Sequence, residues 1–309
     1  MNDYIECPEC KCHVSCDKEV CTWCSASLKT QGADRQFSLG RSKFYSKEYE
    51  AALVSFEKAT ELNPHHHYAW TAKATTLKQL GKEEDISDNL NRMQDINVKY
   101  SSVWYDMGKY LYKIEHHGES VSALMQTIEK EPNHPKAWAL LVDAFGKTAN
   151  NKKIKDIFSR ALDQNSSNAA LWYNLGRSLL ELEKYHMALT AFDKSIDLDP
   201  DHPKIWGLMV NTLSKSGKSD MVDEYVRKVL EKKPKKPYTW STFAEALERL
   251  GLYERALEVY EGGMEIFNEE KTFFVGRGQV LTKLGKYEAA IVDIERAIEM
   301  GLNRLNRVK

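Results

Sequence analysis

Apolar residues recur every three or four positions over most of the chain, which is the spacing of amphipathic helices. Between residues 169 and 202 this pattern predicts two consecutive helices. Their apolar faces are formed by Trp172, Leu175, Leu179 and Leu182 in the first helix and by Ala188, Leu189, Phe192 and Ile196 in the second. Glu183-Lys184-Tyr185 separates the two faces and is predicted to form the turn of a helical hairpin.

The hairpin pattern repeats along the chain with a fixed period. Six of the seven tryptophans are spaced 34 residues apart, at Trp70, Trp104, Trp138, Trp172, Trp206 and Trp240. A fixed period of this length is typical of an array of structural repeats. The same phase, extended in both directions, predicts eight units without insertion or deletion, at 33–66, 67–100, 101–134, 135–168, 169–202, 203–236, 237–270 and 271–304. Gln36 and Phe274 take the tryptophan position in the two outer units.

Further columns of the repeat predict how the helices pack and where they end. A small or slim residue follows the tryptophan position by four residues, at Gly40, Ala74, Gly108, Val142, Gly176, Val210, Ala244 and Gly278. A bulky column stands at Phe56, Leu90, Leu124, Phe158, Phe192, Val226, Tyr260 and Ile294. Glycines mark the turn between the helices at Gly81, Gly217, Gly251 and Gly285, and prolines end units at Pro64, Pro132, Pro200 and Pro234. Proline cannot continue a helix, so we expect it to separate one unit from the next.

These columns carry a resemblance to a known family. The residues Trp172-x2-Leu175-Gly176, Tyr185, Ala188, Phe192 and Pro200 closely resemble the tetratricopeptide repeat, and the resemblance covers about 270 residues. The units at 67–100, 135–168 and 203–236 depart most, because Ile or Val replaces small residues there. The resemblance implies an all-α fold, a right-handed superhelical solenoid of eight hairpins with a concave inner face. It also implies a protein–protein interaction scaffold or adaptor rather than an enzyme.

The resemblance assigns a ligand groove to the first helix of each unit, at unit positions 2, 5, 6, 9, 12 and 13. In the units from 101 to 236, the tyrosine, amide and basic residues at these positions are Tyr105, Lys109, Tyr112, Lys113, Lys136, Lys147, Tyr173, Asn174, Arg177, Lys204, Asn211 and Lys215. The acidic ones are Asp106, Asp143 and Glu181, so the middle of the groove is modestly positive. We expect it to bind an extended, acidic peptide or protein segment. The alternative is a groove that is merely solvated.

All six cysteines lie between Cys7 and Cys24. Cys7-Pro8-Glu9-Cys10 and Cys21-Thr22-Trp23-Cys24 form two C-x2-C pairs, and four thiolates complete a tetrahedral Zn²⁺ site. Together with Leu28 the pattern resembles a short zinc ribbon. We predict structural zinc at Cys7, Cys10, Cys21 and Cys24 in a ribbon at 1–28, followed by a linker at 29–32, with a tail at 305–309. The alternative is a set of free or redox cysteines. Cys12 and Cys16 are surplus to the four ligands; we interpret them as bystanders, and ligand exchange or a thiol sensor is the alternative.

The charge balance argues against a general nucleic-acid binder, because the chain has 44 basic and 45 acidic residues. A nucleic-acid- or ribosome-associated factor that uses the ribbon and the basic part of the groove is the alternative function. No apolar run reaches the roughly 18 residues of a membrane span, and no secretory signal begins the sequence. We therefore expect a cytoplasmic protein with no membrane partner.

We find no catalytic motif, so we expect no enzymatic activity. Gly217-Lys218-Ser219 mimics the end of a phosphate-binding loop, but Thr212 stands where that motif requires glycine. The last predicted helix is rich in apolar residues, at Ala289, Ile291, Val292, Ile294, Ile298 and Met300. An exposed solenoid end is usually polar, so we expect self-association or partner docking there. A small, tolerated apolar patch is the alternative.

Overall fold

The computed structural model describes residues 4–6, 11–15, 29–66, 68–82, 84–148, 151–164 and 166–306. Over these ranges the chain forms sixteen α-helices, a single-turn 3-10 helix and a two-stranded sheet. The expectation of an all-α repeat region is confirmed. The right-handed superhelical path stays a prediction.

In the N-terminal half of the chain the elements are β1 (Tyr4–Glu6), β2 (His13–Ser15), α1 (Lys29–Tyr45), α2 (Tyr49–Leu62), α3 (Ala69–Gln79), α4 (Glu84–Asp95), α5 (Ser101–Lys113), α6 (His117–Lys130), α7 (Ala137–Lys147) and α8 (Asn151–Gln164). The later elements are α9 (Ala169–Glu181), α10 (Tyr185–Leu198), α11 (Ile205–Lys215), η1 (Ser219–Met221), α12 (Val222–Lys232), α13 (Pro237–Arg249), α14 (Tyr253–Ile266), α15 (Lys271–Lys283) and α16 (Tyr287–Asn306). α1 begins at Lys29, so residues 29–32, which we expected to be a linker, are helical. α16 continues to Asn306, beyond residue 304, where we expected the last unit to end.

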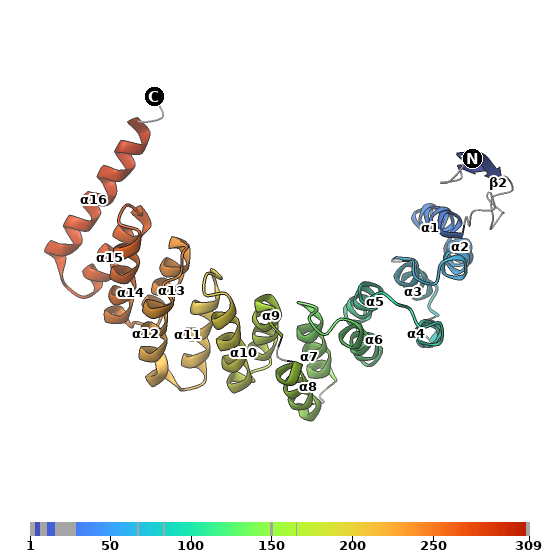
Figure 1. Ribbon diagram of the computed structural model, residues 1–309, viewed down its shortest axis with the longest axis horizontal. Helices are drawn as coiled ribbons and strands as arrows, with labels where there is room; N and C mark the ends of the chain where they lie inside the picture. The colour runs from blue at the N-terminus through green and yellow to red at the C-terminus, as the bar shows by residue number, and fades with distance from the viewer. Residues whose placement is uncertain are drawn as a thin grey trace. The chain divides into compact units, whose positions relative to one another are not determined.

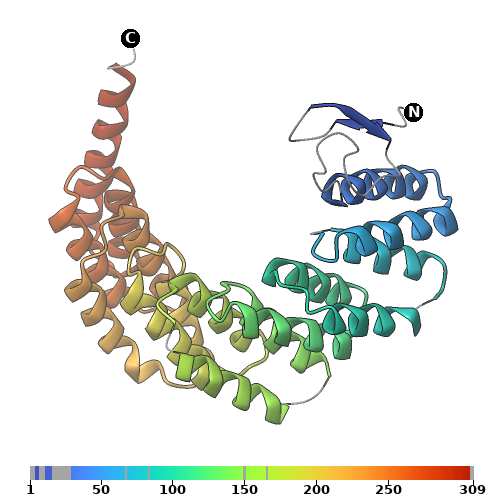
Figure 2. The ribbon, with the colours of Figure 1, turned by 45° about the vertical axis from the view of Figure 1, so that its right-hand side comes forward.

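The chain divides within α8 into two compact parts, Met1–Ile154 and Lys155–Lys309. Inside each part the helices follow one another as antiparallel hairpins (Figures 1 and 2). In the first part α1 contacts α3, α3 contacts α5 and α5 contacts α7; in the second part α11 contacts α13 and α13 contacts α15. The second helices also contact one another, as in the pairs α4–α6 and α12–α14. Each part is therefore a stack with one layer of first helices and one layer of second helices.

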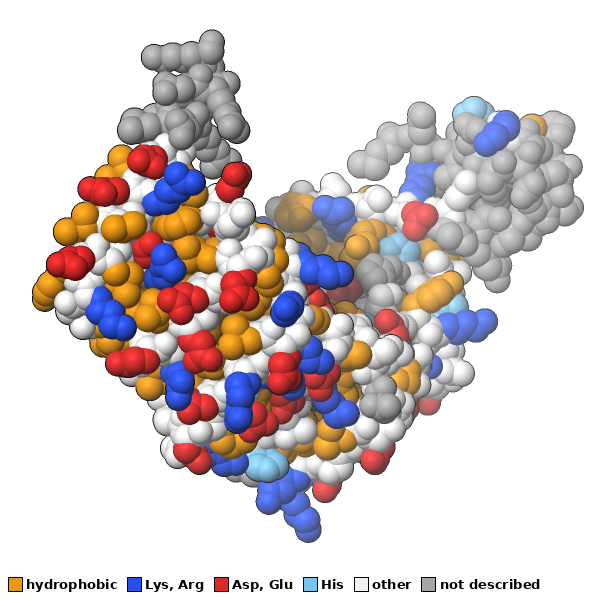
Figure 3. All heavy atoms as spheres, turned by 60° about the vertical axis from the view of Figure 1, so that its left-hand side comes forward, with side chains coloured by type: hydrophobic (Ala, Val, Ile, Leu, Met, Phe, Trp, Pro, Cys, Tyr) orange, Lys and Arg blue, Asp and Glu red, His pale blue; other side chains and the backbone are white. Residues whose placement is uncertain are grey.

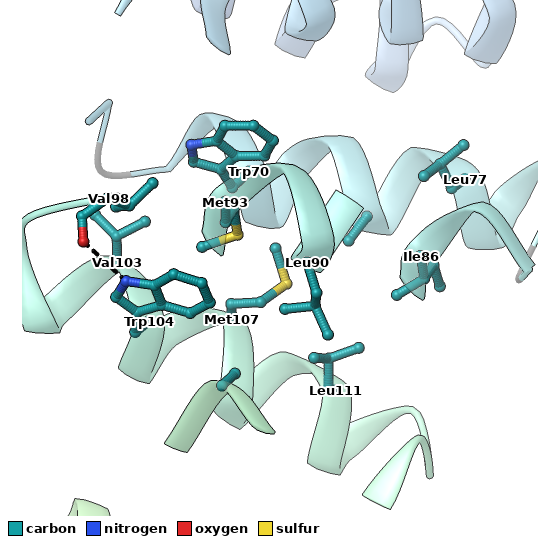
Figure 4. Close-up of a cluster of buried hydrophobic side chains, with 12 residues drawn as sticks. Trp70, Leu77, Ile86, Leu90, Met93, Val98, Val103, Trp104, Met107 and Leu111 are labelled. Carbon is teal, nitrogen blue, oxygen red and sulfur yellow. Dashed lines mark hydrogen bonds between the residues drawn. The ribbon is translucent and has the colours of Figure 1, made fainter. Parts of the chain in front are cut away.

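The tryptophan column lies in the core and joins each unit to the one before it. All six tryptophans of the column are at most 2% exposed. Each indole Nε1–H donates a hydrogen bond of 2.7–2.9 Å to a backbone carbonyl six residues earlier, at the end of the preceding unit. Figure 4 shows one example, in which Trp104 donates to the carbonyl of Val98 at 2.9 Å beside Met93, Val103 and Met107. A buried indole needs a partner for its N–H, and this geometry supplies it at every junction.

The turn between the two helices of a unit has a left-handed residue at one fixed position. Glycine occupies it at Gly81, Gly217, Gly251 and Gly285, with φ between 68° and 74°. Lys47, Glu115 and Glu183 occupy it in three other units, with φ of 63°, 71° and 58°. This residue follows the end of the first helix, where a left-handed conformation lets backbone N–H groups cap the last carbonyls. The glycine turns that we predicted therefore share their backbone conformation with turns that have no glycine.

The small and bulky columns face one another inside each hairpin. A Cβ added to Gly40 would lie 2.6 Å from Phe56 Cε1, and one added to Gly176 would lie 2.6 Å from Phe192 Cε1. Both phenylalanines are at most 1% exposed. The absence of a side chain thus makes room for a ring, which explains why the two columns alternate in size.

Candidate functional site

A cleft of about 620 Å³ lies along the first helices of three successive units in the second part of the chain. Residues on or directly next to α9, α11 and α13 line the cleft. The lining residues are Tyr173 and Arg177, then Lys204, Gly207, Leu208 and Asn211, and finally Tyr238, Thr242, Glu245, Ala246, Arg249 and Leu250. Clefts that bind ligands commonly have volumes of several hundred Å³.

Four of the groove residues that we predicted line this cleft, namely Tyr173, Arg177, Lys204 and Asn211. Asn174 and Lys215 belong to the same helices but are not among the lining residues. The residues from α13 were not predicted, because the groove residues that we assigned all lie in the units up to residue 236. The same unit positions, applied to the next unit, would have identified Tyr238, Thr242, Glu245 and Arg249.

The cleft has an excess of positive charge. Its lining contains three cations, Arg177, Lys204 and Arg249, and one carboxylate, Glu245. Arg249 Nη2 lies 3.4 Å from Glu245 Oε2, and Arg177 Nη2 lies 3.6 Å from Glu181 Oε1. Both are exposed pairs one helical turn apart, which hold their partners only weakly. Within the described residues Lys204 forms no ion pair, so an incoming carboxylate meets little competition.

Aromatic side chains stand at both ends of the cleft. The Tyr173 ring packs against His202 with 4.0 Å between the ring centroids, and Arg177 Cζ lies 6.0 Å from the Tyr173 centroid. Burial lowers the pKa of His202, partly offset by Asp199, so this imidazole adds no charge at neutral pH. Tyr238, on the other side, is 59% exposed. Exposed tyrosines offer flat, amphipathic contact area to a bound chain.

The floor of the cleft is open because Gly207 has no side chain. A Cβ at this position would lie 3.4 Å from Ala246 Cβ and 3.5 Å from the carbonyl oxygen of Thr242, which are ordinary contact distances. An alanine would therefore fit the fold, and its methyl group would occupy space that now belongs to the cleft.

The other groove residues that we predicted lie in the first part of the chain. Tyr105, Lys109, Tyr112 and Lys113 are on α5, Lys136 precedes α7, and Lys147 ends it. The four lysines are exposed.

His134 links this face to the start of α7. Its ring lies 4.3 Å from that of Tyr105, and its Nδ1 accepts hydrogen bonds from the backbone N–H groups of Lys136 and Ala137. The imidazole therefore caps the helix, which requires an unprotonated Nδ1. Burial lowers the pKa of His134, with a smaller opposing effect of Glu131.

The predicted zinc ligands Cys7, Cys10, Cys21 and Cys24 lie outside the described residues. On either side of the first pair, β1 and β2 form an antiparallel ladder in which Ile5 pairs with Val14 and Glu6 with His13. Over the part of the chain that is described, no group of three or more His, Cys, Asp or Glu side chains is arranged to hold a metal ion.

The last helix has an exposed apolar face. Ile291, Val292, Ile294 and Ile298 are between 44% and 63% exposed, and Tyr287 is 64% exposed. All but Tyr287 belong to the residues that we singled out for self-association.

On the face of the molecule drawn in Figure 3, basic and acidic side chains are interspersed among apolar ones, and neither sign of charge forms a continuous patch.

The fold and the cleft define an α-helical repeat protein whose first helices present an open, charged surface. Family models identify the repeat. Residues 169–202 match one model of the tetratricopeptide repeat, and residues 33–66 and 273–300 match another. Two of these segments coincide with units that the tryptophan period predicted, and the chain contains tetratricopeptide repeats. Among the described residues, no helix is long and apolar enough to cross a membrane.

Curated relatives share the repeat over limited stretches. The chain is 25% identical over 95 residues to small glutamine-rich tetratricopeptide repeat-containing protein 2 of Mycosarcoma maydis, covering 31% of this chain and 27% of that protein. It is 25% identical over 118 residues to the STIP1 homolog of Dictyostelium discoideum, covering 38% and 21%. It is 23% identical over 148 residues to anaphase-promoting complex subunit 3 of Schizosaccharomyces pombe, covering 45% and 22%. The matches thus span about a quarter of the length of these relatives.

Solved structures match the chain, but their overall agreement with its structure is low. A structure from work on Pseudomonas aeruginosa pilF is 15% identical, with a TM-score of 0.36, and covers 79% of this chain and 96% of that one. The structure of MamA protein is 15% identical, with a TM-score of 0.35, and covers 65% and 91%.

Proposed function

We propose that this protein is a non-catalytic cytoplasmic scaffold that binds an extended, acidic segment of a partner protein in the cleft formed by α9, α11 and α13. The observation that carries the proposal is the lining of that cleft, in which three cations and two tyrosines face one carboxylate. Among the relatives, one is named as a subunit of a multiprotein complex, which is in keeping with a role in protein assembly.

The chemistry of the cleft favours a carboxylate-bearing chain. Arg177 and Arg249 present planar groups that can bind a carboxylate through two parallel hydrogen bonds, and Lys204, directly before α11, adds a point charge to the same lining. The apolar floor at Leu208 and Ala246 can contact the aliphatic parts of the same segment. Charges at such a surface mainly set partner choice and association rate, so salt should weaken binding without abolishing it.

The test compares two charge-reversed variants of the full chain. Immobilised wild-type protein captures partners from an extract of its own cells, beside the cleft variant R177E/K204E. The matched control is K155E/R227E, which reverses two exposed cations on α8 and α12 outside the cleft lining. We expect the cleft variant to lose a specific protein that the control retains, with at least a tenfold loss of affinity for the purified partner.

A nucleic-acid partner would give a different result. If only RNA or DNA is captured, nuclease treatment removes it, and binding falls steeply with salt, the scaffold proposal is wrong and the alternative function holds. If both variants retain every captured protein, the cleft is not the binding site.

We also propose that Cys7, Cys10, Cys21 and Cys24 hold a structural zinc ion in the N-terminal segment. The donor set supports this, because four thiolates in two C-x2-C pairs suit a tetrahedral Zn²⁺ ion. The antiparallel pairing of β1 with β2 on either side of the first pair is compatible with a ribbon. A segment this short has few apolar residues, so bound metal would supply much of its folding free energy.

A further inference from the structure

A second pocket, of about 410 Å³, lies on the first helices of the first two units. It is formed by α1 and α3, with one ring from α2 at its base. The lining residues are Phe37, Arg41, Phe44, Tyr45, Phe56, Tyr68, Thr71, Ala72 and Thr75. Apart from Phe56, they occupy the unit positions that we assigned to the groove, although we applied those positions only to the units from 101 to 236.

The pocket is aromatic and open to solvent. Phe56 at its base is 1% exposed, whereas Tyr45 and Tyr68 at its rim are 74% and 56% exposed. Phe37 lies between them, with its ring 5.8 Å from Phe56 and stacked at 6.3 Å on Tyr68. Exposed aromatic rings around a buried apolar base form a favourable binding site for a large apolar side chain.

One cation stands in this apolar setting. The guanidinium of Arg41 lies 5.9 Å from the Phe37 centroid and 6.0 Å from the Tyr45 centroid, so two rings flank the charged group. Over the described residues Arg41 forms no ion pair, and no carboxylate lines the pocket.

Two acidic groups on the neighbouring helices lie beside other basic side chains. Asp34 Oδ1 lies 3.1 Å from His66 Nε2, and Glu57 Oε1 lies 3.3 Å from the nearly buried Lys73 Nζ. The charge that complements Arg41 is therefore missing from the walls of the pocket. A ligand that brings both an apolar side chain and a carboxylate would satisfy the rings and the guanidinium at the same time.

We infer that this pocket binds a peptide in which a bulky apolar side chain stands next to a carboxylate. The ring or aliphatic group enters between Tyr45, Tyr68 and Phe56, and the carboxylate pairs with Arg41. This is a second docking site with different chemistry from the cleft at α9, α11 and α13. It shares with the proposed function only the premise that the partners are peptide segments.

The test uses fluorescein-labelled peptides and the full chain in an anisotropy titration. The probe is Gly-Ser-Phe-Asp-Gly-Ser-Gly with blocked ends, and its matched forms replace Phe by Ala or Asp by Asn. We expect the parent probe to bind at least tenfold more tightly than either matched form, because each change removes one of the two interactions. A second pair, Gly-Ser-Gly-Phe with a free or an amidated C-terminus, shows whether a terminal carboxylate serves as well as a side chain.

Variants of the protein locate the binding. R41Q should reduce the affinity for the Asp probe to that for the Asn probe and leave the Asn probe unaffected, which is the signature of a direct pair in a double-mutant cycle. K58Q, an exposed cation on α2 outside the pocket, should change neither affinity. The cleft variant R177E/K204E should bind the probe as well as wild type does, which separates this inference from the proposed function.

Three results would overturn the inference. The first is equal binding of the Asp and Asn probes, and the second is an equal loss of both probes in R41Q. The third concerns Trp23, the large apolar side chain of the second C-x2-C pair. If a W23A variant binds the probe and the wild-type chain does not, the occupant of the pocket is the protein's own N-terminal segment.

Discussion

Replacing Gly176 with alanine should destabilise the α9–α10 hairpin, although alanine is the better helix former. Gly176 lies inside α9 at a buried position. If only intrinsic propensity mattered, the substitution would stabilise the helix by about 1 kcal/mol. The packing against α10 opposes this gain.

The structure gives the size of the opposing effect. The new Cβ would lie 2.6 Å from Cε1 and 2.7 Å from Cδ1 of Phe192, well inside normal contact distance. Phe192 is 0% exposed, so its ring has no solvent-filled space into which it can move. Overpacking of this kind typically costs about 1–3 kcal/mol. We therefore expect a net destabilisation of up to about 2 kcal/mol, the difference between the steric cost and the propensity gain.

A second substitution should relieve the clash. The unit at 67–100 already combines Ala74 with Leu90 at these two columns. F192L alone should cost about 1 kcal/mol, because it leaves unfilled space beside the glycine. In the double variant G176A/F192L, the methyl group and the smaller side chain fit together. We expect the two effects to be non-additive by at least about 1 kcal/mol.

The assay must report on one hairpin, because repeat arrays do not unfold as a single two-state unit. Hydrogen exchange followed by mass spectrometry gives the opening free energy of peptides from α9 and α10, with peptides from α14 as the internal reference. A stabilised hairpin in G176A, or strictly additive effects in the double variant, would refute the reasoning from ring contact.

Four further predictions address the cleft, the helix caps, the metal and the last helix. G207A should raise the stability of α11 by up to about 1 kcal/mol yet weaken partner binding several-fold, because its methyl group fills the floor of the cleft. Hydrogen exchange of peptides from α11 measures the first effect and titration the second, and unchanged binding would show that the floor is not contacted. The lowered pKa of His134 means that the folded chain binds fewer protons than the unfolded chain near pH 6, so stability should fall as the pH drops below about 6.5. H134N should reduce this fall, measured as the opening free energy of peptides from α7 by hydrogen exchange at pH 7.5 and 5.5. Elemental analysis should find one zinc ion per chain, lost when the four predicted cysteine ligands are changed to serine, while helical circular dichroism is largely retained; zinc in the serine variant would disprove the ligand set. If the apolar face of α16 mediates self-association, light scattering should show a mass that rises with concentration for wild type but not for I291K/I298K.

The repeat could be predicted from the sequence because its core contacts recur with the same geometry. Each column tryptophan is buried and donates to a carbonyl at the end of the preceding unit, so the same residue recurs every 34 positions in the six inner units. Predicting the turns worked where glycine marks them. At Glu183 the break between two apolar faces predicted the turn. Lys47 and Glu115, whose backbone is equally left-handed, gave no local signal, because only the phase of the repeat distinguishes them from ordinary surface positions.

Only four of the twelve residues that line the cleft were predicted from the sequence, for a different reason. Our interpretation followed charge in the middle of the chain, and it identified Tyr173, Arg177, Lys204 and Asn211. It did not include the α13 wall, and it did not consider the aromatic residues at the same positions of the first two units. Whether a groove position lines a cleft depends on side chains from two or three helices at once. A count of charges along the sequence does not contain that information.

In each unit the packing columns and the groove positions are under different physical constraints, so stability and recognition depend on different residues. The tryptophan, small and bulky columns must fit each other across every hairpin, as the contact distance at Gly176 shows, so their chemistry varies little along the chain. The groove positions do not take part in this pairing of small with bulky residues, and their side chains differ from unit to unit. In the first two units they gather rings around Arg41, whereas between α9 and α13 they gather three cations and two tyrosines. Substitutions in the columns should therefore change the free energy of unfolding and leave partner choice intact, while substitutions at the groove positions should change which peptide is bound and leave the fold intact.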